Sequence, residues 1–293
     1  MTNSIQGDVL RTKETLKLIL GELDWKKNNK GKMIGCSTGY NKLDHFLGGL
    51  QGGKLYCLAA RPGMGKTSFA LNVALFSAFK LQKDTLIFSL EKSAKMMLTR
   101  LISIHSMIEY RNFKTGEIND YDWVKVENAV DDICSSPLIV IDDIWNIDEI
   151  EEKSQEYFRN NKDGLIVIDY LQLISEGNKI GSENRKHIGS IVRRLNMLAR
   201  KLNVPIIVLS QISRAMENRK DKHPLLCDFR EIDVVNYSDV VLFLYRDDYY
   251  NLDSEKPGVA ELMVAKNNDG PCGLVELAWI GKCQKYANLS YRS

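Results

Sequence analysis

Short runs of apolar residues recur along the first two thirds of the chain, and longer amphipathic stretches separate them. Five runs predict buried strands, at 55–60, 85–90, 138–143, 165–169 and 205–209. Stretches in which apolar positions recur at helical spacing predict helices at 93–108, 121–134, 145–158 and 185–201. Strands that alternate with helices indicate an α/β domain with a mostly parallel sheet.

The last part of the chain has a different pattern, with strands that follow one another directly. Apolar runs at 240–245, 260–265 and 274–280 are separated by turn sequences rather than by helices. Strands joined in this way pair antiparallel. We therefore expect a mostly parallel sheet that antiparallel strands extend at its C-terminal side.

An amphipathic helix is predicted ahead of the domain, over 8–23. Its apolar stripe consists of Val9, Leu16, Ile19, Leu20 and Leu23. A polar stretch at 28–32 ends it, so we divide the chain into a linker helix with its linker, 1–33, and a main domain, 34–293. Periodicity leaves open whether the stripe packs on its own domain or on a neighbouring subunit.

Charge is informative through its distribution. The 293 residues include 40 Lys and Arg and 38 Asp and Glu, a net charge of only +2. Between 183 and 223, however, ten residues are basic and three are acidic. This segment is the one in which binding to nucleic acid is worth considering.

Composition excludes several other classes of protein. No run of about 18 apolar residues is present, and no apolar stretch follows a basic N-terminus, so neither a membrane span nor a secretory signal is predicted. The six cysteines and four histidines show no metal-ligand spacing. We expect a soluble cytoplasmic protein whose cysteines are packing residues.

The turn after the first predicted strand has the sequence of a phosphate loop. It consists of Arg61, Pro62, Gly63, Met64 and Gly65, and Lys66, Thr67 and Ser68 follow at the start of a helix. Glycine lets backbone N–H groups curl around a phosphate, lysine reaches the phosphates, and the threonine hydroxyl binds Mg²⁺. Ala60 occupies the position where the first glycine of such loops usually lies. A nucleoside triphosphate site is therefore predicted at this turn.

Acidic and polar residues end several of the other strands. Glu91 follows the second strand, at the sheet edge where a base that activates water would lie. Two strands end in aspartate, at Asp143 and at Asp169, and either pattern suits a carboxylate that holds Mg²⁺. Chain order favours Asp169, because the next strand ends at Gln211, which is placed as a γ-phosphate sensor. Asp142 and Asp143 are then expected to begin a helix.

Two basic segments flank the strand that ends at Gln211. The helix at 185–201 has apolar residues on one side and basic residues on the other, and a charged loop spans 214–222. A solvated surface explains the helix alone, but a basic loop at the nucleotide edge could also hold a phosphate polymer. Aromatic residues are not interleaved, so base stacking is not indicated.

These motifs, taken in order, resemble those of a known family. TGYNKLD, GGLQGG, AARPGMGKTSFALNVA, FSLEKS, LIVIDYLQLI, the segment from ENRKHIG to ENRKDKHP, DVVLFLYRDDYY and AKNNDGPCGLVELAWIGK are similar to the C-terminal motor domain of DnaB-type replicative helicases. The similarity covers about residues 34–293. The helix before residue 30 resembles the linker helix that packs on the adjacent subunit of a hexameric ring, and the N-terminal domain that usually precedes it is not in this sequence.

The resemblance implies a RecA-like P-loop NTPase core that hydrolyses ATP with Mg²⁺ and moves along single-stranded DNA from 5′ to 3′. It implies catalytic roles for Lys66, Glu91, Asp169 and Gln211, with Thr67 and Asp169 at the metal. The other implied nucleotide contacts are the loop residues 61–68, Lys266 and Arg246. The implied DNA contacts are Arg185, Lys186, Arg214, Arg219, Lys220 and Lys222. The resemblance implies that the chain assembles into a homohexamer and that its partners are a helicase loader, primase or a host helicase. It implies no association with a membrane.

The sequence departs from the family pattern in two places. Asn268 occupies the position of an arginine that the family offers to the neighbouring subunit's γ-phosphate, although Lys266 is kept. In related phosphoryl-transfer systems such an arginine is worth about 10³ to 10⁵ in rate, so its loss predicts slow turnover. The stretch 232–238 also lacks the usual residues, which puts the link between nucleotide and DNA loops in doubt.

Three hypotheses follow from these patterns. The first is a ring-forming, ATP-driven DNA helicase. The second, motivated by Asn268, is an accessory or regulatory protein that binds ATP and DNA with weak turnover. The third is a RecA-like ATPase of strand exchange or repair that forms filaments, and the extended match to the helicases argues against it.

Overall fold

The computed structural model describes residues 12–17, 19–21, 23–24, 27–29, 33–161, 163–177 and 187–289. The chain divides into two units, Met1–Ile34 and Gly35–Ser293. In the first unit most of the described residues are helical, and Leu16, Ile19, Leu20 and Leu23 are exposed. Val9, the other residue of the predicted stripe, lies outside the described residues. The helix is therefore confirmed over its described part.

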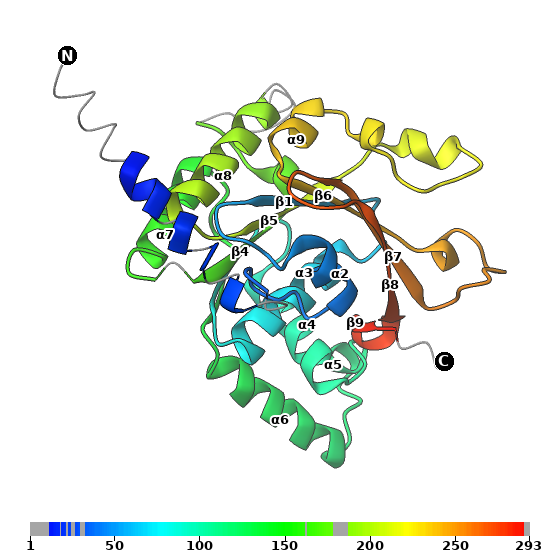
Figure 1. Cartoon of the computed structure of the whole chain (residues 1–293). Coiled ribbons are helices and arrows are strands. Elements are labelled where there is room, and N and C mark those ends of the chain that lie inside the picture. The colour runs from blue at the N-terminus through cyan, green and yellow to red at the C-terminus, as the bar shows by residue number, and fades with distance from the viewer. Residues whose placement is uncertain are drawn as a thin grey trace. The chain divides into compact units, whose positions relative to one another are not determined.

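The second unit is built on a sheet with nine strands in its described residues (Figure 1). In spatial order these are β3 (Leu138–Ile141), β2 (Asp84–Ser89), β4 (Gly164–Asp169), β5 (Ile206–Gln211), β1 (Leu55–Ala60), β6 (Val240–Tyr245), β7 (Val259–Asn267), β8 (Gly273–Ile280) and β9 (Lys285–Asn288). Neighbouring strands from β3 to β6 pair parallel, whereas β6, β7, β8 and β9 pair antiparallel. The predicted fold class is confirmed.

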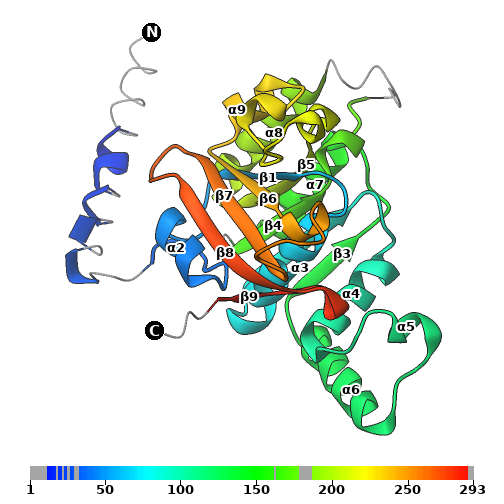
Figure 2. The same ribbon diagram turned by 90° about the vertical axis from the view of Figure 1, so that its right-hand side faces the viewer.

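Helices cover both faces of this sheet (Figures 1 and 2). One apolar layer joins the sheet to α2 (Asn41–Leu47), α3 (Lys66–Leu75), which continues as η1 (Phe76–Lys80), and α4 (Ala94–Ser106). The other layer joins it to α7 (Ile147–Tyr157), α8 (Ile188–Leu202) and α9 (Ile232–Tyr237). The α6 helix (Asp120–Cys134) packs on α4, and the short α5 (Asn112–Thr115) precedes it. The strands β1, β2, β4, β5 and β6 are thus largely buried from both sides, as their continuous apolar runs require, whereas β3, the last strand of the parallel part, is only partly buried.

The amphipathic pattern of α8 explains how this helix is positioned. Ile188, Ile191, Val192, Leu195 and Leu198 are all buried against the sheet, as the sequence predicts. The helix ends at Leu202, where the next residue takes a left-handed conformation. Immediately beyond it, β5 carries the chain back to the edge of the sheet at which the phosphate loop lies.

Three features differ from the sequence-based expectations. The stretch before the phosphate strand, expected as a lead-in, forms α2, and the last described residues form the unpredicted strand β9. Asp142 does not begin a helix, because its carboxylate accepts a hydrogen bond from the backbone N–H of Ala94 at 2.6 Å. The N-cap of α7 is Asn146 instead, whose side chain accepts from the N–H of Asp148. Asp142 therefore binds the first backbone N–H of α4, in addition to the N-cap residue of that helix, Ser93.

Candidate functional site

Strand order brings the predicted chemical groups to one edge of the sheet. The carboxyl ends of β2, β4, β5 and β1 lie side by side there. Ser89 of β2 pairs with Asp169 of β4, and Ala60 of β1 pairs with Gln211 of β5. Ile168 of β4 pairs with Val208, so β5 extends beyond Asp169 to Gln211 at this edge. Glu91 and the phosphate loop follow directly. In open α/β sheets this edge is where ligands bind.

The phosphate loop needs glycine at two positions. Gly63 and Gly65 have φ angles of 82° and 96°, a left-handed region that favours glycine. A Cβ atom at Gly65 would lie 2.3 Å from the hydroxyl oxygen of Tyr286. Between them Met64 is buried, with 1% exposure, and anchors the loop to the core. The loop therefore presents backbone and leaves room for a ligand above α3.

Lys66 is folded back onto its own loop. Its Nζ donates to the carbonyl oxygen of Ala60 at 3.0 Å and to that of Arg61 at 3.5 Å. Burial lowers its pKa to about 8, although Asp169 and Glu91 oppose the shift. An anion in the pocket would offset this cost of burying the ammonium group. The lysine is thus poised to exchange backbone carbonyls for phosphate oxygens.

Thr67 and Asp169 form a direct pair at the floor of the site. The threonine hydroxyl donates to Asp169 Oδ2 at 2.8 Å, and Asp169 has an exposure of only 3%. Burial raises the pKa of Asp169, and the hydrogen bond from Thr67 opposes this rise. In the described part of the chain no group of three or more His, Cys, Asp or Glu side chains could hold a metal ion. A hydroxyl and a carboxylate nevertheless fit Mg²⁺, which uses few protein ligands and keeps water and phosphate oxygens.

Two further polar residues lie at the same edge. Glu91 is exposed and pairs with Lys92, Oε2 to Nζ, at 2.9 Å. Gln211 also has an exposed side chain, while its backbone N–H donates to Gln172 Oε1 at 3.2 Å. Both side chains are therefore accessible to a ligand and to water.

A cleft of about 470 Å³ brings these groups together. Lys66, Thr67, Glu91, Asp169 and Gln211 all contribute to its lining, as do Pro62, Gly63, Gly65 and Ser68 of the predicted loop. Its volume is suited to a small-molecule ligand, for which clefts of roughly 300 to 1,000 Å³ are usual. The predicted catalytic residues therefore share one cavity.

The cleft also contains residues that sequence reasoning missed. Lys92, Arg100, Tyr170, Trp279, Gly281 and Gln284 complete its lining. The Nε atom of Arg100 is buried without a hydrogen-bond partner among the described residues, and its guanidinium lies 5.7 Å from the Tyr110 ring centroid. In the sequence, only the place of Arg100 in the predicted helix, nine residues after Glu91, indicates that it could lie near the site. The C-terminal residues reach the cleft through strand pairing, which no local motif reveals.

Several predicted nucleotide contacts lie elsewhere. The Arg61 side chain turns away from the cleft to Glu217 and to the carbonyl of Ile212. Arg246 pairs with Asp248 at 3.1 Å and stacks 5.0 Å from the ring centroid of Trp279, which lines the cleft, but Arg246 itself does not line it.

Lys266 lies at the opposite edge of the sheet, the one formed by the amino ends of the parallel strands. It pairs with Val241 near the start of β6, because β7 runs antiparallel. Its Nζ donates to the carbonyl oxygens of Val235 and Ser238, each at 2.7 Å, at the end of α9. Nearby, the backbone N–H of Asn268 donates to the carbonyl of Asp239 at 3.1 Å. Lys266 therefore does not meet the phosphate loop of its own chain.

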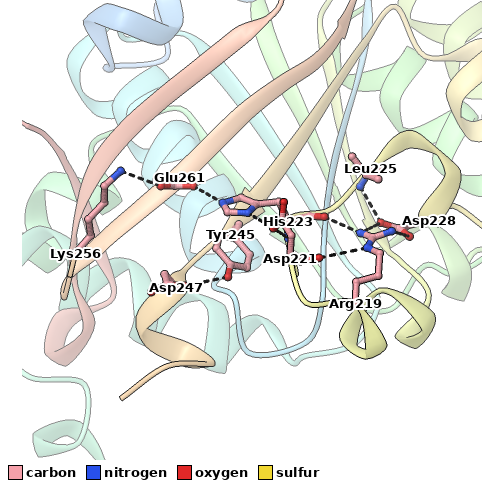
Figure 3. Close-up of polar contacts among 9 residues, drawn as sticks. All are labelled: Arg219, Asp221, His223, Leu225, Asp228, Tyr245, Asp247, Lys256 and Glu261. Carbon is pink, nitrogen blue, oxygen red and sulfur yellow. Dashed lines mark hydrogen bonds and ion pairs between the residues drawn. The ribbon is translucent and has the colours of Figure 1, made fainter. Parts of the chain in front are cut away.

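The predicted DNA contacts divide into three groups. Arg185 and Lys186 lie outside the described residues. Arg214 and Lys220 are exposed. Arg219 instead makes two hydrogen bonds to Asp228, each 2.8 Å long, and a third to the carbonyl of His223 (Figure 3). Lys222 lies 4.9 Å from the Tyr250 ring centroid.

His223 fastens the end of this basic loop to β7 (Figure 3). Its Nε2 lies 2.8 Å from Glu261 Oε2, its Nδ1 contacts Asp221, and its ring packs against Tyr245 with centroids 4.1 Å apart. Burial lowers the pKa of His223, but hydrogen bonds to Asp221 and Glu261 outweigh this effect and raise it above the ordinary value. The loop is thus braced at both ends, with Arg214 and Lys220 on its surface.

A parallel sheet that carries a glycine-rich loop, a buried Asp–Thr pair and a polar cleft at its carboxyl edge defines a nucleotide-binding ATPase domain of the RecA type. Within this class, the chain belongs to the DnaB-like helicase C-terminal domain family, whose match covers residues 35–288. The predicted family resemblance is confirmed.

Named relatives agree with this assignment. Replicative DNA helicase DnaB of Geobacillus stearothermophilus is 39% identical over 98% of this chain and 63% of its own length. Replicative DNA helicase DnaC of Bacillus subtilis (strain 168) is 38% identical over 96% and 62%. The chain thus spans less than two thirds of these relatives.

Solved structures share the fold over nearly the whole chain. An ATPase domain aligns with a TM-score of 0.88 and 33% identity, over 95% of this chain and 98% of its own. A DnaB-like replicative helicase, studied for its interactions with primase, aligns with a TM-score of 0.84 and 32% identity, over 94% and 66%. No helix in the described ranges is long and apolar enough to cross a bilayer.

Proposed function

We propose that this chain is the motor domain of a replicative DNA helicase, which hydrolyses ATP to move along single-stranded DNA. The observation that carries the proposal is the single cleft that Lys66, Thr67, Glu91, Asp169 and Gln211 share. Residues 1–33 serve as linker helix and linker, and 34–293 as the motor. The family and the named relatives support the choice of polymer.

The residues divide the work of phosphoryl transfer among them. Lys66 leaves the carbonyls of Ala60 and Arg61 and binds the β- and γ-phosphates. Thr67 and Asp169 would hold Mg²⁺, which would supply positive charge against the charge that develops on the phosphate oxygens. Glu91 orients the attacking water and accepts its proton, and Gln211 donates to the γ-phosphate. Arg100 satisfies its buried Nε on an anionic oxygen of the nucleotide.

The remaining parts of the proposal concern other molecules. Arg214 and Lys220 contact phosphates of single-stranded DNA, and Arg185 and Lys186 are proposed to join them. The chain forms a homohexameric ring that translocates from 5′ to 3′, with a loader, primase or host helicase as partner. Lys266, at the far edge of the sheet, serves the nucleotide of a neighbouring subunit.

The direct test measures ATP hydrolysis by purified protein with and without single-stranded DNA, together with unwinding of a 5′-tailed fork. We expect DNA to stimulate hydrolysis and the fork to be separated. A 3′-tailed fork is the matched control and should remain annealed. Hydrolysis without any response to DNA, or an assembly that separates neither fork, contradicts the proposal.

A second candidate is an accessory protein that binds ATP and DNA but turns ATP over slowly. It is favoured by Asn268, whose backbone N–H is bonded to Asp239 and whose side chain carries no charge. Asn268→Arg discriminates the two, with Asn251→Arg in another exposed turn as control. A gain of tenfold or more in turnover for the first variant alone supports the accessory protein, and equal rates support the motor.

A further inference from the structure

The side chain of Arg61 connects the phosphate loop to a distant segment. Arg61 is the first residue after β1, and its exposure is only 7%. Its Nε donates to Glu217 Oε1 at 2.9 Å, and its Nη1 donates to the carbonyl oxygen of Ile212 at 2.9 Å. A buried cation needs such partners, and breaking one of them is costly. The start of the phosphate loop is therefore held by residues that follow β5.

Glu217 lies in η4 (Arg214–Asn218), the segment that presents exposed basic residues. The same carboxylate oxygen that accepts from Arg61 also accepts from the hydroxyl of Tyr250, at 3.2 Å. The Arg61 guanidinium holds the pKa of Glu217 below its ordinary value, so the pair stays charged at neutral pH. One carboxylate thus joins η4, the phosphate loop and the turn after β6.

That turn contacts the phosphate loop a second time. Tyr249, beside Tyr250 in the chain, packs closely on Gly63. A Cβ atom added at Gly63 would lie only 2.7 to 2.8 Å from atoms of the Tyr249 side chain. The two tyrosine rings themselves meet edge to face, with centroids 5.3 Å apart. A shift of the loop at Gly63 is therefore passed to Tyr250 and Glu217 through side chains in contact.

Lys66 connects this arrangement to the ligand. In the structure its Nζ binds the carbonyl oxygens of Ala60 and Arg61. A phosphate that draws Lys66 into the cleft removes both hydrogen bonds, one of them from the backbone of Arg61 itself. Phosphate binding would thus change the hydrogen bonding of Arg61, the residue whose side chain holds Glu217.

We propose that Glu217 is a positioning residue that couples the nucleotide cleft to segment 213–223. Through Arg61 it sets the position of η4, and hence of Arg214 and Lys220, according to whether Lys66 binds the loop or a phosphate. The inference rests on the proposed function only for the identity of the polymer, single-stranded DNA. Coupling of this kind is a free energy that both ligands share, so each changes the affinity of the other by the same factor.

The experiment measures the Kd of a fluorescent oligothymidine with and without a saturating non-hydrolysable ATP analogue. The ratio of the two Kd values reports coupling, and for the unmodified chain we expect fivefold or more. Glu217→Ala should reduce the ratio to below twofold. Glu217→Gln, which keeps an acceptor for Arg61 without the charge, should give an intermediate ratio. Glu255→Gln, an exposed carboxylate elsewhere, should keep the full ratio.

Three outcomes overturn the inference. The first is a single Kd for the oligonucleotide in both nucleotide states of the unmodified chain. The second is a full ratio in Glu217→Ala, including the case in which both Kd values weaken equally, as expected of a merely structural residue. If Glu217→Ala does not fold, Glu217→Gln carries the test, and an unchanged ratio rejects the coupling. Failure of the unmodified chain to bind DNA or ATP at all contradicts the proposed function instead.

Discussion

The two edges of the central sheet use their cations in opposite ways. At the carboxyl edge Lys66, Lys92 and Arg100 face a cleft. At the other edge the cations serve the fold, because Lys266 binds carbonyl groups at the end of α9 and Lys54 pairs with Asp269 at 2.6 Å. The first edge is therefore prepared for an anionic ligand in the isolated chain. At the second edge the Lys266 ammonium group is occupied by internal hydrogen bonds.

This difference follows from topology. Parallel strands bring their carboxyl ends to one edge, so residues after β1, β2, β4 and β5 meet without help from another chain. The antiparallel strand β7 returns to the opposite edge, and the residues after it lie far from their own phosphate loop. The predicted catalytic residues thus come together within one chain, whereas Lys266 and Asn268 lie at the opposite edge of the sheet.

The largest expected effect comes from removing the cation at the carboxyl edge. Lys66→Ala should weaken ATP binding by about a hundredfold and abolish hydrolysis, because the variant lacks the ammonium group that would bind the phosphates. Titration with a fluorescent ATP analogue measures the affinity. Lys54→Ala is the matched control at the other edge and should leave it unchanged. Equal losses of ATP affinity in Lys66→Ala and Lys54→Ala would contradict the difference between the two edges.

A smaller effect is expected from Arg100, the missed cation of the cleft. Arg100→Gln should weaken the binding of ATP and ADP by about tenfold or more, since a charge-assisted hydrogen bond is worth roughly 1.5 to 3 kcal/mol. Lys95→Gln, an exposed lysine on the same helix, is the control. Calorimetric titration with ATP, ADP and adenosine measures the affinity for each ligand and shows whether Arg100 contacts the phosphates or the nucleoside. A loss that extends to adenosine would mean that Arg100 does not act on phosphate.

The lowered pKa of Lys66 predicts a pH dependence at the same edge. With a pKa of about 8 the ammonium group is mostly charged at pH 7 and mostly neutral at pH 8.5. Because phosphates bind the charged form, affinity should fall by about fourfold between these pH values. Lys66→Arg, which stays charged, should bind with little change over this range. The same pH dependence in both proteins would assign it to another group.

The smallest effect concerns the opposite edge. Lys266→Met should lower the free energy of unfolding by about 1 kcal/mol, because carbonyl groups at the end of α9 lose their donor. Nucleotide affinity of the isolated subunit should not change. Urea denaturation followed by circular dichroism measures the first quantity, with Lys282→Met, at an exposed position, as control. Weaker nucleotide binding by the isolated Lys266→Met subunit would contradict the separation of the two edges.

Much of the fold could be predicted because its signals are local. Continuous apolar runs located β1 and β6 to the residue, and strand order selected Asp169 over Asp142 and Asp143. The phosphate loop carries its own conformational requirement in Gly63 and Gly65. These inferences need no knowledge of how distant segments pack.

The parts that could not be predicted depend on partners far along the chain. Asp142 binds the first backbone N–H of α4 rather than beginning α7, and Arg61 turns toward Glu217, 156 residues away. The two hydrogen bonds from Arg219 to Asp228 could not be foreseen either, and a contact of Arg219 with DNA stays a prediction. A basic residue in a loop looks alike in sequence whether it faces solvent or an internal carboxylate. The strand β9 is similarly short and acquires its place by pairing with β8 and by contacts with α3.

The most direct test of the nucleotide edge compares ATP binding with ATP hydrolysis in Glu91→Gln. This change keeps the size of the side chain and removes the carboxylate that accepts a proton from water. We predict an ATP affinity within threefold of the unmodified chain and a single-turnover hydrolysis rate at least a hundredfold lower. Hydrolysis at an undiminished rate by a variant that still binds ATP would contradict the account.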